Sequence, residues 1–306
     1  MRRRLAIIGS GPAGYSAAIY AARAGLAPLV ITGTEFGGAI ARTQHLENYP
    51  GFARKIDGLF LTEEMRQQAE GFGAEIKAAS VASADFSARP LRLGLDDGSA
   101  LELDAAIVAT GTAHRKLGLA NEASLVGKGV SYCATCDGFF FKGKDVFVVG
   151  GGNSAVYETL YLSTICKSVT LVHRRNELKA EEINRRALTE AGNVTLLMES
   201  TVEEIVERGG RLAALVIKTP EGVKEFAASA LFVSIGVEPA TAFLGGALEL
   251  DAQGYIKCAP DSCATSVEGV FAAGDVKNPR YRQAVIAAAS GAQAAMEARA
   301  FLASAE

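Results

Sequence analysis

Two cysteines stand three residues apart near the middle of the chain, in the run CATCDG at residues 133–138. This spacing serves three kinds of chemistry, because a zinc site, a structural disulfide and a redox-active pair all bring two sulfurs to within a few ångströms of each other. The spacing alone does not choose among them. The choice depends on the elements that flank the pair.

Composition narrows the classes of protein to which the chain can belong. Its 306 residues are 49% hydrophobic, which is enough for two domains with hydrophobic cores. The net charge is −3 and the basic residues are dispersed, so nucleic acid is not an expected partner. Five cysteines, an odd number, indicate a reducing compartment with at most one special pair. No stretch reaches the roughly 20 uninterrupted apolar residues of a membrane span, and the arginine-rich start is better explained by the nucleotide turn that follows than by a signal peptide.

The beginning of the chain has the pattern of a strand, a glycine-rich turn, a helix and a second strand. An apolar run leads into GSGPAG at 9–14, an Ala-rich helical pattern follows, and the apolar run LVIT closes the unit. In a dinucleotide-binding unit Gly9 makes the tight turn, Gly11 lets backbone N–H groups approach a pyrophosphate, and Gly14 lets the helix pack against the strand. The positive end of the helix then faces the phosphates.

The same order recurs directly after the cysteine pair. The apolar run DVFVVG leads into GGGNSA, in which Gly150, Gly152 and Ala155 hold the three positions, and a helical pattern and the strand SVTLV follow. Each copy is followed by a matching apolar strand that ends in glycine, AIVATG at 106–111 and LFVSIG at 231–236. This repeat predicts an α/β protein with two Rossmann-like nucleotide-binding domains. The alternative is one large Rossmann domain with an accidental second glycine cluster.

The end of each second strand indicates which nucleotide is bound. The second copy has HRR at 173–175, where an NAD-binding unit would carry an acidic residue. Arg174 and Arg175 offer planar donors to a 2′-phosphate and Lys179 adds a third positive charge, so this unit is expected to bind NADPH. The alternative is a solvated basic helix start.

The nucleotide of the first copy is better identified from the far end of the chain. Its acidic residue, Glu35, comes later than the usual spacing of roughly 20 residues from the glycine turn. The run TSVEGVFAAGD brings Asp275 to the end of an apolar strand, and RQA at 282–284 opens an Ala-rich helix. This looks like the second half of an FAD site, with the acid near the ribitol chain. Alternatively, Asp275 is an ordinary turn residue.

These motifs together carry a family resemblance that spans nearly the whole chain. In order, GSGPAG, ENYPGF, ATG, CATCDG, GGGNSA, HRR, GVFAAGDV and YRQA resemble the motifs of bacterial-type, low-molecular-weight thioredoxin reductases. Two positions depart from the family pattern. Lys179 stands where the family often has Arg, which keeps the charge but loses bidentate geometry, and Ala240 replaces an Asn found in many relatives.

The resemblance implies a discontinuous FAD domain, residues 1–112 and 245–306, with an NADPH domain at 113–244 and a hinge near Gly245 and Gly246. It also implies an NADPH-dependent enzyme that reduces thioredoxin or a similar small dithiol protein, a rotation of the two domains during turnover, a homodimer and a cytoplasmic location.

By the same resemblance the Cys133 and Cys136 disulfide carries the electrons. Cys136 would face the flavin, Cys133 would meet the partner, and Asp137 would act as general acid or base, unless it only forms a turn. The residues expected to bind FAD are Gly9, Gly11, Pro12, Ala13, Gly14, Glu35, Asn48, Ala109, Thr110, Gly111, Gly274, Asp275, Arg282, Gln283 and Ala284. Those expected to bind NADPH are Gly150, Gly152, Asn153, Ser154, Ala155, His173, Arg174, Arg175 and Lys179.

The other cysteines and histidines have no comparable pattern. Cys166 is expected to be buried, Cys258 and Cys263 are not expected to form a second redox pair, and His45 and His114 are expected at the surface. Zinc is disfavoured because no second Cys-x-x-Cys or paired His completes four ligands.

Two alternative functions stay open. In one, the same chemistry serves another acceptor, a peroxiredoxin-linked dithiol or a low-molecular-weight disulfide. In the other, the chain is a non-catalytic dinucleotide-binding module in which CATCDG is structural.

Overall fold

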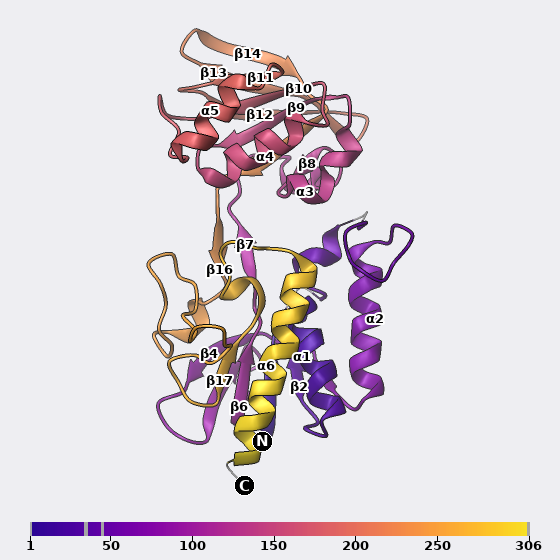
Figure 1. Cartoon of the computed structure of the whole chain (residues 1–306), viewed down its shortest axis with the longest axis vertical. Coiled ribbons are helices and arrows are strands. Elements are labelled where there is room, and N and C mark those ends of the chain that lie inside the picture. Colours follow the sequence, from indigo (N-terminus) through magenta and orange to yellow (C-terminus); the bar gives the residue numbers. More distant parts are fainter. Residues whose placement is uncertain (1, 34–35, 44–45, 305–306) are drawn as a thin grey trace. The chain divides into compact units, whose positions relative to one another are not determined.

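Residues 2–33, 36–43 and 46–304 are described by the structure, a computed structural model (Figure 1). The chain divides into two compact units, which we call the outer unit (residues 1–113 and 238–306) and the inserted unit (residues 114–237). Two short strands, β7 (Thr112–His114) and β16 (Val237–Pro239), pair with each other where the chain passes between the units. Residues 238–244, which we assigned from the sequence to the NADPH domain, lie in the outer unit.

The outer unit is built on a seven-stranded sheet with the order β3-β2-β1-β6-β5-β4, and β17 also pairs with β6. Its strands are β1 (Arg2–Ile8), β2 (Leu29–Ile31), β3 (Glu75–Lys77), β4 (Val81–Asp85), β5 (Leu91–Leu95), β6 (Ala100–Val108) and β17 (Val270–Ala272). Its helices are α1 (Pro12–Arg23), α2 (Gly58–Gly71) and α6 (Ala284–Ser304), with the 3₁₀ turns η1 (Ala39–Arg42), η4 (Ala242–Leu244) and η5 (Gly274–Val276).

Alternation along β1 creates two cores in this unit. Leu5 and Ile7 join a cluster with buried residues of α1, α2 and α6. Their neighbours Ala6 and Ile8 join a second cluster, which includes Leu248 from the segment between η4 and β17. Since successive strand residues point to opposite faces, a central strand with two apolar faces must be covered on both sides. This burial on both faces explains why the start of the sequence is continuously apolar rather than alternating.

The inserted unit contains a five-stranded parallel sheet with the order β11-β10-β9-β15-β8 and a three-stranded antiparallel sheet, β12-β13-β14. Its strands are β8 (Val130–Ser131), β9 (Asp145–Gly150), β10 (Ser168–Val172), β11 (Val194–Leu197), β12 (Thr201–Arg208), β13 (Arg211–Thr219), β14 (Gly222–Ala227) and β15 (Ala230–Ser234). Its helices are α3 (Ala134–Asp137), α4 (Asn153–Ser163) and α5 (Glu182–Glu190), with the 3₁₀ turns η2 (Ala123–Leu125) and η3 (Gly138–Phe141).

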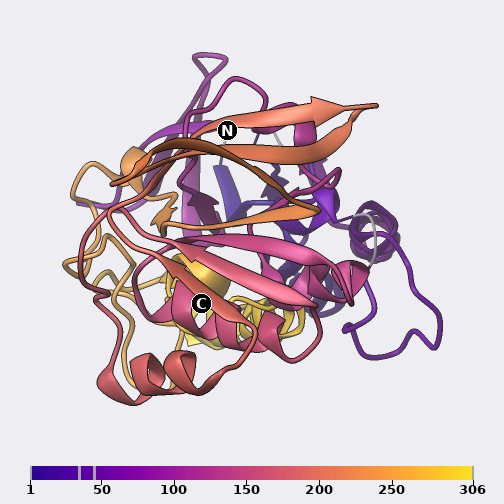
Figure 2. The same cartoon turned by 90° about the horizontal axis from the view of Figure 1, so that it is seen from above.

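The parallel sheet of the inserted unit is covered by different partners on its two faces. Val146 and Val148 pack with α4 and α5, whereas Phe147 packs with buried residues of β12 and β13. Figure 2 shows these layers, with the antiparallel strands on one side of the parallel sheet and the helices on the other.

The predicted internal repeat is confirmed by the strand pairings. In the outer unit β1 lies between β2 and β6, with Ile8 opposite Val108, and all of these pairs are parallel. In the inserted unit β9 lies between β10 and β15, with Gly150 opposite Ser234, again in parallel. In both units, therefore, the first strand of the repeat lies between its second strand and the predicted apolar strand ending in glycine.

The first glycine of each repeat lies too close to the backbone of a neighbouring strand to carry a side chain. A Cβ on Gly9, whose φ is +117°, would lie 2.3 Å from the carbonyl oxygen of Ala109. A Cβ on Gly150, whose φ is +157°, would lie 2.3 Å from the carbonyl oxygen of Ser234. Backbone atoms on both sides leave no room for relief by side-chain movement. The turn therefore packs against the strand end only if this position is glycine.

Helix α1 is also held from its other side by α6. A Cβ on Gly291 would lie 2.0 Å from the carbonyl oxygen of Ala13, and one on Gly274 would lie 2.8 Å from the Ala13 Cβ. The N–H of Gly274 donates to Ser290 Oγ at 2.6 Å. The start of α1 is thus fixed between the sheet and the last helix of the chain.

We predict that Gly291→Ala destabilises the protein by about 1–3 kcal/mol, because the added methyl group meets backbone that cannot move without shifting α1. Gly71→Ala is the matched control, since a Cβ there meets nothing within 4 Å. It should be neutral or stabilise the protein by up to about 1 kcal/mol. Urea denaturation followed by circular dichroism measures both, and equal stabilities of the two variants would contradict this account of the contact.

Candidate functional site

The two cysteines of CATCDG form a disulfide on a short turn of the inserted unit. Cys133 and Cys136 are joined with an S–S distance of 2.18 Å and a Cα–Cα distance of 5.3 Å, and both are half-buried. Cys133 is the N-cap residue of α3. A Cβ on Gly138 would lie 2.9 Å from Cδ2 of Leu162 on α4. The turn that carries the disulfide therefore packs directly on the helix of the second nucleotide unit.

A hydroxyl group connects the disulfide turn to its carboxylate. Ser131, which is buried, donates from Oγ to Asp137 Oδ2 at 2.6 Å and accepts from the N–H of Cys133 at 3.1 Å. The N–H of Asp137 in turn donates to the carbonyl of Cys133 at 3.1 Å. The sequence pattern indicated Asp137 but not Ser131.

The other three cysteines are free thiols. Cys166 is buried, as predicted, and burial raises its pKa to about 11. Burial also raises the pKa of Cys258, and it raises that of Cys263 to about 11 although the nearby Lys277 ammonium opposes the shift. A high thiol pKa leaves little thiolate at neutral pH. This is consistent with the prediction that Cys258 and Cys263 are not a second redox pair.

Of the two histidines without an expected role, only His114 is described by the structure. The ring of His114 stacks on that of Tyr132, the residue before Cys133, with the ring centroids 5.1 Å apart. The sequence pattern gave no sign of this partner. His45 lies outside the described residues.

The first glycine turn presents the N-terminus of α1 at the end of β1. Gly11 is the N-cap residue and forms no side-chain cap, and its carbonyl accepts from the N–H of Tyr15, so the N–H groups of the helix before Tyr15 are placed for a ligand or water. Behind the turn, Ser10 Oγ donates to the carbonyl of Thr32 and accepts from the N–H of Gly37. These bonds tie the turn to the loop after β2. Glu35 belongs to that loop but lies outside the described residues.

The ATG run follows β6 beside this turn. Thr110 Oγ1 donates to the carbonyl of Ala240 at 2.8 Å, and the N–H of Ala240 donates to the carbonyl of Gly111 at 3.0 Å. The backbone of Ala240 therefore makes two contacts here, although its side chain offers none of the polar groups of the Asn found in many relatives.

Residues from distant parts of the sequence meet in the remainder of the expected FAD site. Asn48 Nδ2 donates to Gln283 Oε1 at 3.3 Å. Burial raises the pKa of Asp275 to about 6, and the nearby Arg282 guanidinium offsets part of the shift. A Cβ on Gly274, next to Asp275, would meet Ala13 in the first turn of α1. The strand end that carries Asp275 thus lies against the start of α1.

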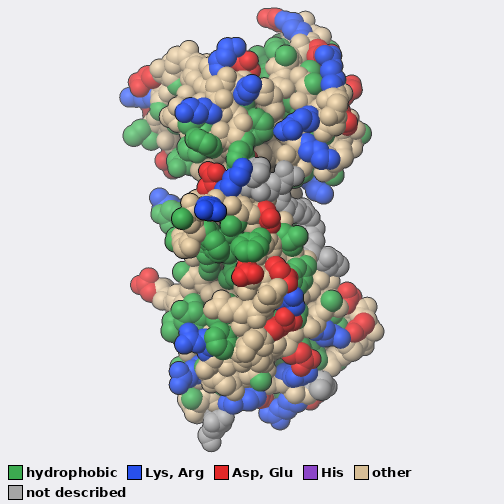
Figure 3. All heavy atoms as spheres, turned by 90° about the vertical axis from the view of Figure 1, so that its right-hand side faces the viewer, with side chains coloured by type: hydrophobic (Ala, Val, Ile, Leu, Met, Phe, Trp, Pro, Cys, Tyr) green, Lys and Arg blue, Asp and Glu red, His purple; other side chains and the backbone are tan. Residues whose placement is uncertain are grey.

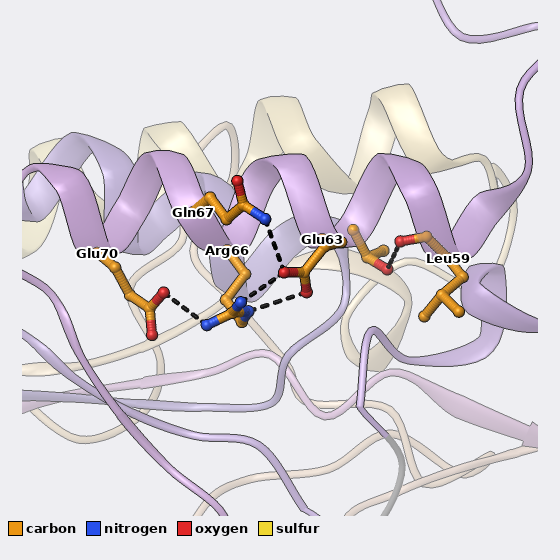
Figure 4. A network of polar contacts seen from close by, with 6 residues as sticks. Leu59, Glu63, Arg66, Gln67 and Glu70 are labelled. Atoms are coloured by element: carbon orange, nitrogen blue, oxygen red, sulfur yellow. Dashed lines mark hydrogen bonds and ion pairs between the residues drawn. The ribbon is translucent and has the colours of Figure 1, made fainter.

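A network of polar contacts lies on α2 (Figure 4) and contacts the loop after β2 through Phe36. Arg66 donates to Glu63 at 2.5 and 2.9 Å and to Glu70 at 2.6 Å, and Gln67 donates to Glu63 at 2.8 Å. These bonds, with that to Arg66 the strongest, lower the pKa of Glu63 to about 2. The Arg66 guanidinium lies 5.7 Å from the ring centroid of Phe36. No motif in the sequence indicated this network.

The second glycine turn is arranged in the same way at the end of β9. Gly152 is the N-cap residue of α4 and forms no side-chain cap. A Cβ on Gly151 would lie 2.1 Å from the ring of His173, so this ring lies directly on the turn. The backbone N–H of Lys179 donates to the carbonyl of Gly151 at 2.7 Å. Lys179 therefore supports the turn through its main chain, a role that its charge did not suggest.

Several polar side chains lie at this turn and at the end of β10. Asn153 Oδ1 accepts from the N–H of Glu181 at 2.8 Å, which fixes the side chain at the start of α4. Ser154 is exposed beside it, and Arg174 and Arg175 are exposed just after β10. The structure brings the glycine turn and the end of β10 together through His173. Gly151 and Glu181 were not proposed from the sequence.

Other types of site find no support among the described residues. No group of three or more His, Cys, Asp or Glu in this part of the chain could hold a metal ion. None of its helices is long and apolar enough to cross a membrane. On the face drawn in Figure 3, Lys and Arg side chains are mixed with acidic and apolar ones in both units.

Comparisons of the sequence and of the structure with known proteins point to the same group of enzymes. The family model of the pyridine nucleotide-disulphide oxidoreductases matches residues 3–291. The thioredoxin reductase of Streptomyces coelicolor is 45% identical over 305 residues, covering 98% of this chain and 94% of that protein, and the one of Rickettsia prowazekii is 44% identical, covering 98% of each. Among solved structures, thioredoxin reductases from Giardia duodenalis and Streptococcus pyogenes have a TM-score of 0.92, at 39% and 36% identity, and each comparison covers 99% of both chains.

We predict that the half-buried Asp275 makes the cofactor-free protein less stable as the pH rises. Its pKa is about 6 in the folded chain against an ordinary value of 3.8, so between these values the folded chain binds more protons than the unfolded chain. The free energy of unfolding should therefore fall by up to about 3 kcal/mol between pH 4 and pH 7, relative to the Asp275→Asn variant.

Denaturation of the FAD-free protein across this pH range measures the difference. Asp96→Asn, at an exposed position, is the control and should keep the wild-type pH dependence. Parallel pH dependences of wild type and Asp275→Asn would contradict the assignment.

Proposed function

The chain belongs to the pyridine nucleotide-disulphide oxidoreductase family and, within it, to the thioredoxin reductases. From this membership we propose that it is an FAD-containing, NADPH-dependent reductase that acts on the disulfide of thioredoxin, or of a similar small dithiol protein, by means of its own Cys133–Cys136 pair. The observation that carries the proposal is that the turn with this disulfide packs, at Gly138, against α4, the helix that begins at the second glycine turn.

The residues of the outer unit fit FAD. Thioredoxin reductases of this family use FAD and NADPH. The uncapped start of α1 suits a pyrophosphate, because helix N–H groups and the helix dipole favour negative charge there. A desolvated carboxyl such as Asp275 suits the hydroxyl groups of a ribitol chain. The described residues that would hold FAD are those predicted from the sequence, Glu35 excepted.

The residues of the inserted unit fit NADPH. The uncapped start of α4, with Asn153 and Ser154, would hold the pyrophosphate. The guanidinium groups of Arg174 and Arg175 would bind the 2′-phosphate, with Lys179 nearby. The chemistry that the two bound cofactors supply is hydride transfer from NADPH to FAD and two electrons toward a neighbouring disulfide.

The chain's own residues carry out the thiol chemistry. Two electrons and two protons convert the Cys133–Cys136 disulfide into two thiols. The Cys133 thiolate then attacks one sulfur of the partner disulfide, which gives a mixed disulfide and releases the other partner sulfur as a thiol. The Cys136 thiolate attacks Cys133, which restores the pair and releases the reduced partner. Asp137 takes up and returns the proton of the cysteine sulfurs in these steps.

We also propose that the protein works as a homodimer in the cytoplasm. Three of its cysteines are free thiols and only one pair is joined, as expected for a protein from a reducing compartment.

The pair Arg174 and Arg175 is expected to select NADPH over NADH. Replacing both by Ala should raise the KM for NADPH about 10- to 100-fold and change the KM for NADH by no more than about twofold, because only NADPH has the phosphate that the guanidinium groups would bind. Steady-state kinetics with each nucleotide measure this. Arg186→Ala is the matched control, since Arg186 is an exposed arginine of the same unit paired with Glu182 on α5. Equal losses with both nucleotides would contradict the assignment.

Reduction of thioredoxin coupled to NADPH oxidation tests the proposed function as a whole. The wild type should consume one NADPH for each thioredoxin disulfide. Cys133→Ser and Cys136→Ser should each lower the rate by at least about a thousandfold, as expected when a nucleophile is removed. Cys166→Ala should keep most of the activity because this thiol is buried and inert.

Activity confined to a peroxiredoxin-linked dithiol or a low-molecular-weight disulfide would change the acceptor but keep the chemistry. Failure to reduce any disulfide would leave only a dinucleotide-binding module and would refute the proposal.

A further inference from the structure

The side chain of Ser131 connects the carboxylate of Asp137 to the main chain of Cys133. Its hydroxyl has one hydrogen, and the 2.6 Å contact with Asp137 Oδ2 is much shorter than the 3.3 Å contact with the carbonyl of Cys133. The hydrogen therefore belongs to the bond with Asp137. The same oxygen accepts from the N–H of Cys133. A continuous chain of hydrogen bonds thus runs from the backbone N–H of Cys133 through the Ser131 hydroxyl to the carboxylate of Asp137.

The position of Ser131 is set by the sheet rather than by the disulfide turn. Ser131 is 4% exposed and lies on β8, opposite Phe232 of β15, which is fully buried. Two residues earlier, Gly129 has a φ of +123°, and a Cβ there would lie 2.5 Å from the Cβ of Leu212. A side chain on a strand held in this way is a precise support for a neighbouring reactive group.

We propose that Ser131 is a positioning residue for the reaction, which acts through Asp137. The inference rests on the proposed function, in which Asp137 exchanges a proton with the cysteine sulfurs. The Ser131 hydroxyl holds the carboxylate in one orientation toward the disulfide turn. It also favours the ionised carboxylate, because a donated hydrogen bond stabilises the charged form over the protonated one. Without this hydroxyl, Asp137 keeps its proton to a higher pH.

Other titratable groups surround the turn, and the replacement of Ser131 leaves all of them in place. The elements that pack against α3 are η3 and α4. The groups concerned are Cys133 and Cys136 themselves, Tyr132 beside them with its partners His114 and Glu122, Lys142 at the end of η3, and Glu158 and Tyr161 on α4. Since Ser131 has no charge of its own, a pH effect of its replacement reports on the bond to Asp137.

The test is the pH dependence of a single turnover, with oxidised thioredoxin mixed by stopped flow with the NADPH-reduced holoenzyme between pH 5 and 9. In Ser131→Ala the midpoint of that limb of the rate profile which titrates Asp137, and which Asp137→Asn removes, should move up by about one pH unit. The reduction of the flavin by NADPH should keep the wild-type rate. Ser131→Thr, which keeps the hydroxyl, should have the wild-type midpoint. Ser131→Gly is a second variant that removes it, should Ser131→Ala fold poorly.

Ser168→Ala is the matched control. Ser168 Oγ donates to Asp145 Oδ1 at 2.7 Å in the same unit, so this variant removes the same kind of bond without touching the disulfide turn, and it should leave the midpoint unchanged. In the Asp137→Asn background, Ser131→Ala should cause no further shift.

The outcomes separate the inference from the proposed function. An active wild type with the same midpoint in Ser131→Ala and Ser131→Gly overturns the role of Ser131 alone. So does a further shift in the Asp137→Asn background, since Ser131 would then act by another route. A wild type that transfers no electrons to thioredoxin or to any other disulfide overturns the proposed function, and the inference with it.

Discussion

Both glycine turns require a residue without a side chain at the end of the first strand of each repeat. At Gly9 and at Gly150 the main chain passes so near a carbonyl oxygen of the neighbouring strand that a Cβ would lie 2.3 Å away in both places. The direction in which each helix leaves its strand is thereby set by the sheet itself. As a result, the uncapped starts of α1 and α4 are held at the strand ends, where their N–H groups suit a pyrophosphate.

In the inserted unit the same constraint extends to the disulfide. The carbonyl that excludes a side chain at Gly150 belongs to Ser234 on β15, and β15 also pairs with β8, which ends at Ser131. The disulfide turn is therefore held from two sides. Ser131 holds Cys133 and Asp137 from the sheet, while the close contact at Gly138 holds the turn on α4. The reactive sulfurs and the glycine turn thus belong to one set of packed elements, β8, β15 and α4, which sets the position of the disulfide within the inserted unit.

The fold and the reactive pair were accessible from the sequence because they rest on local patterns. The apolar strands, the glycine turns and the Cys-x-x-Cys each lie within a few consecutive residues, and the repeat made the turns specific. What could not be predicted depends on contacts between distant residues. Gly291 looks like any small residue in an Ala-rich helix, and only its crossing with Ala13 explains it. Ser131 looks like a strand residue until the turn brings Asp137 to its hydroxyl. Lys179 was assigned to the NADPH site because of its charge, yet in the structure its backbone N–H also donates to the carbonyl of Gly151.

The central claim is that electrons from NADPH reach the Cys133–Cys136 pair and no other sulfurs of the chain. Its most direct test is to add one equivalent of NADPH to the purified protein without oxygen, to record the flavin spectrum, and to locate new thiols by alkylation and peptide mass spectrometry. We expect a yellow protein with two new alkylated residues, Cys133 and Cys136, and no change at Cys166, Cys258 and Cys263. A colourless protein, or a flavin that is reduced by NADPH while the disulfide never opens, would contradict it.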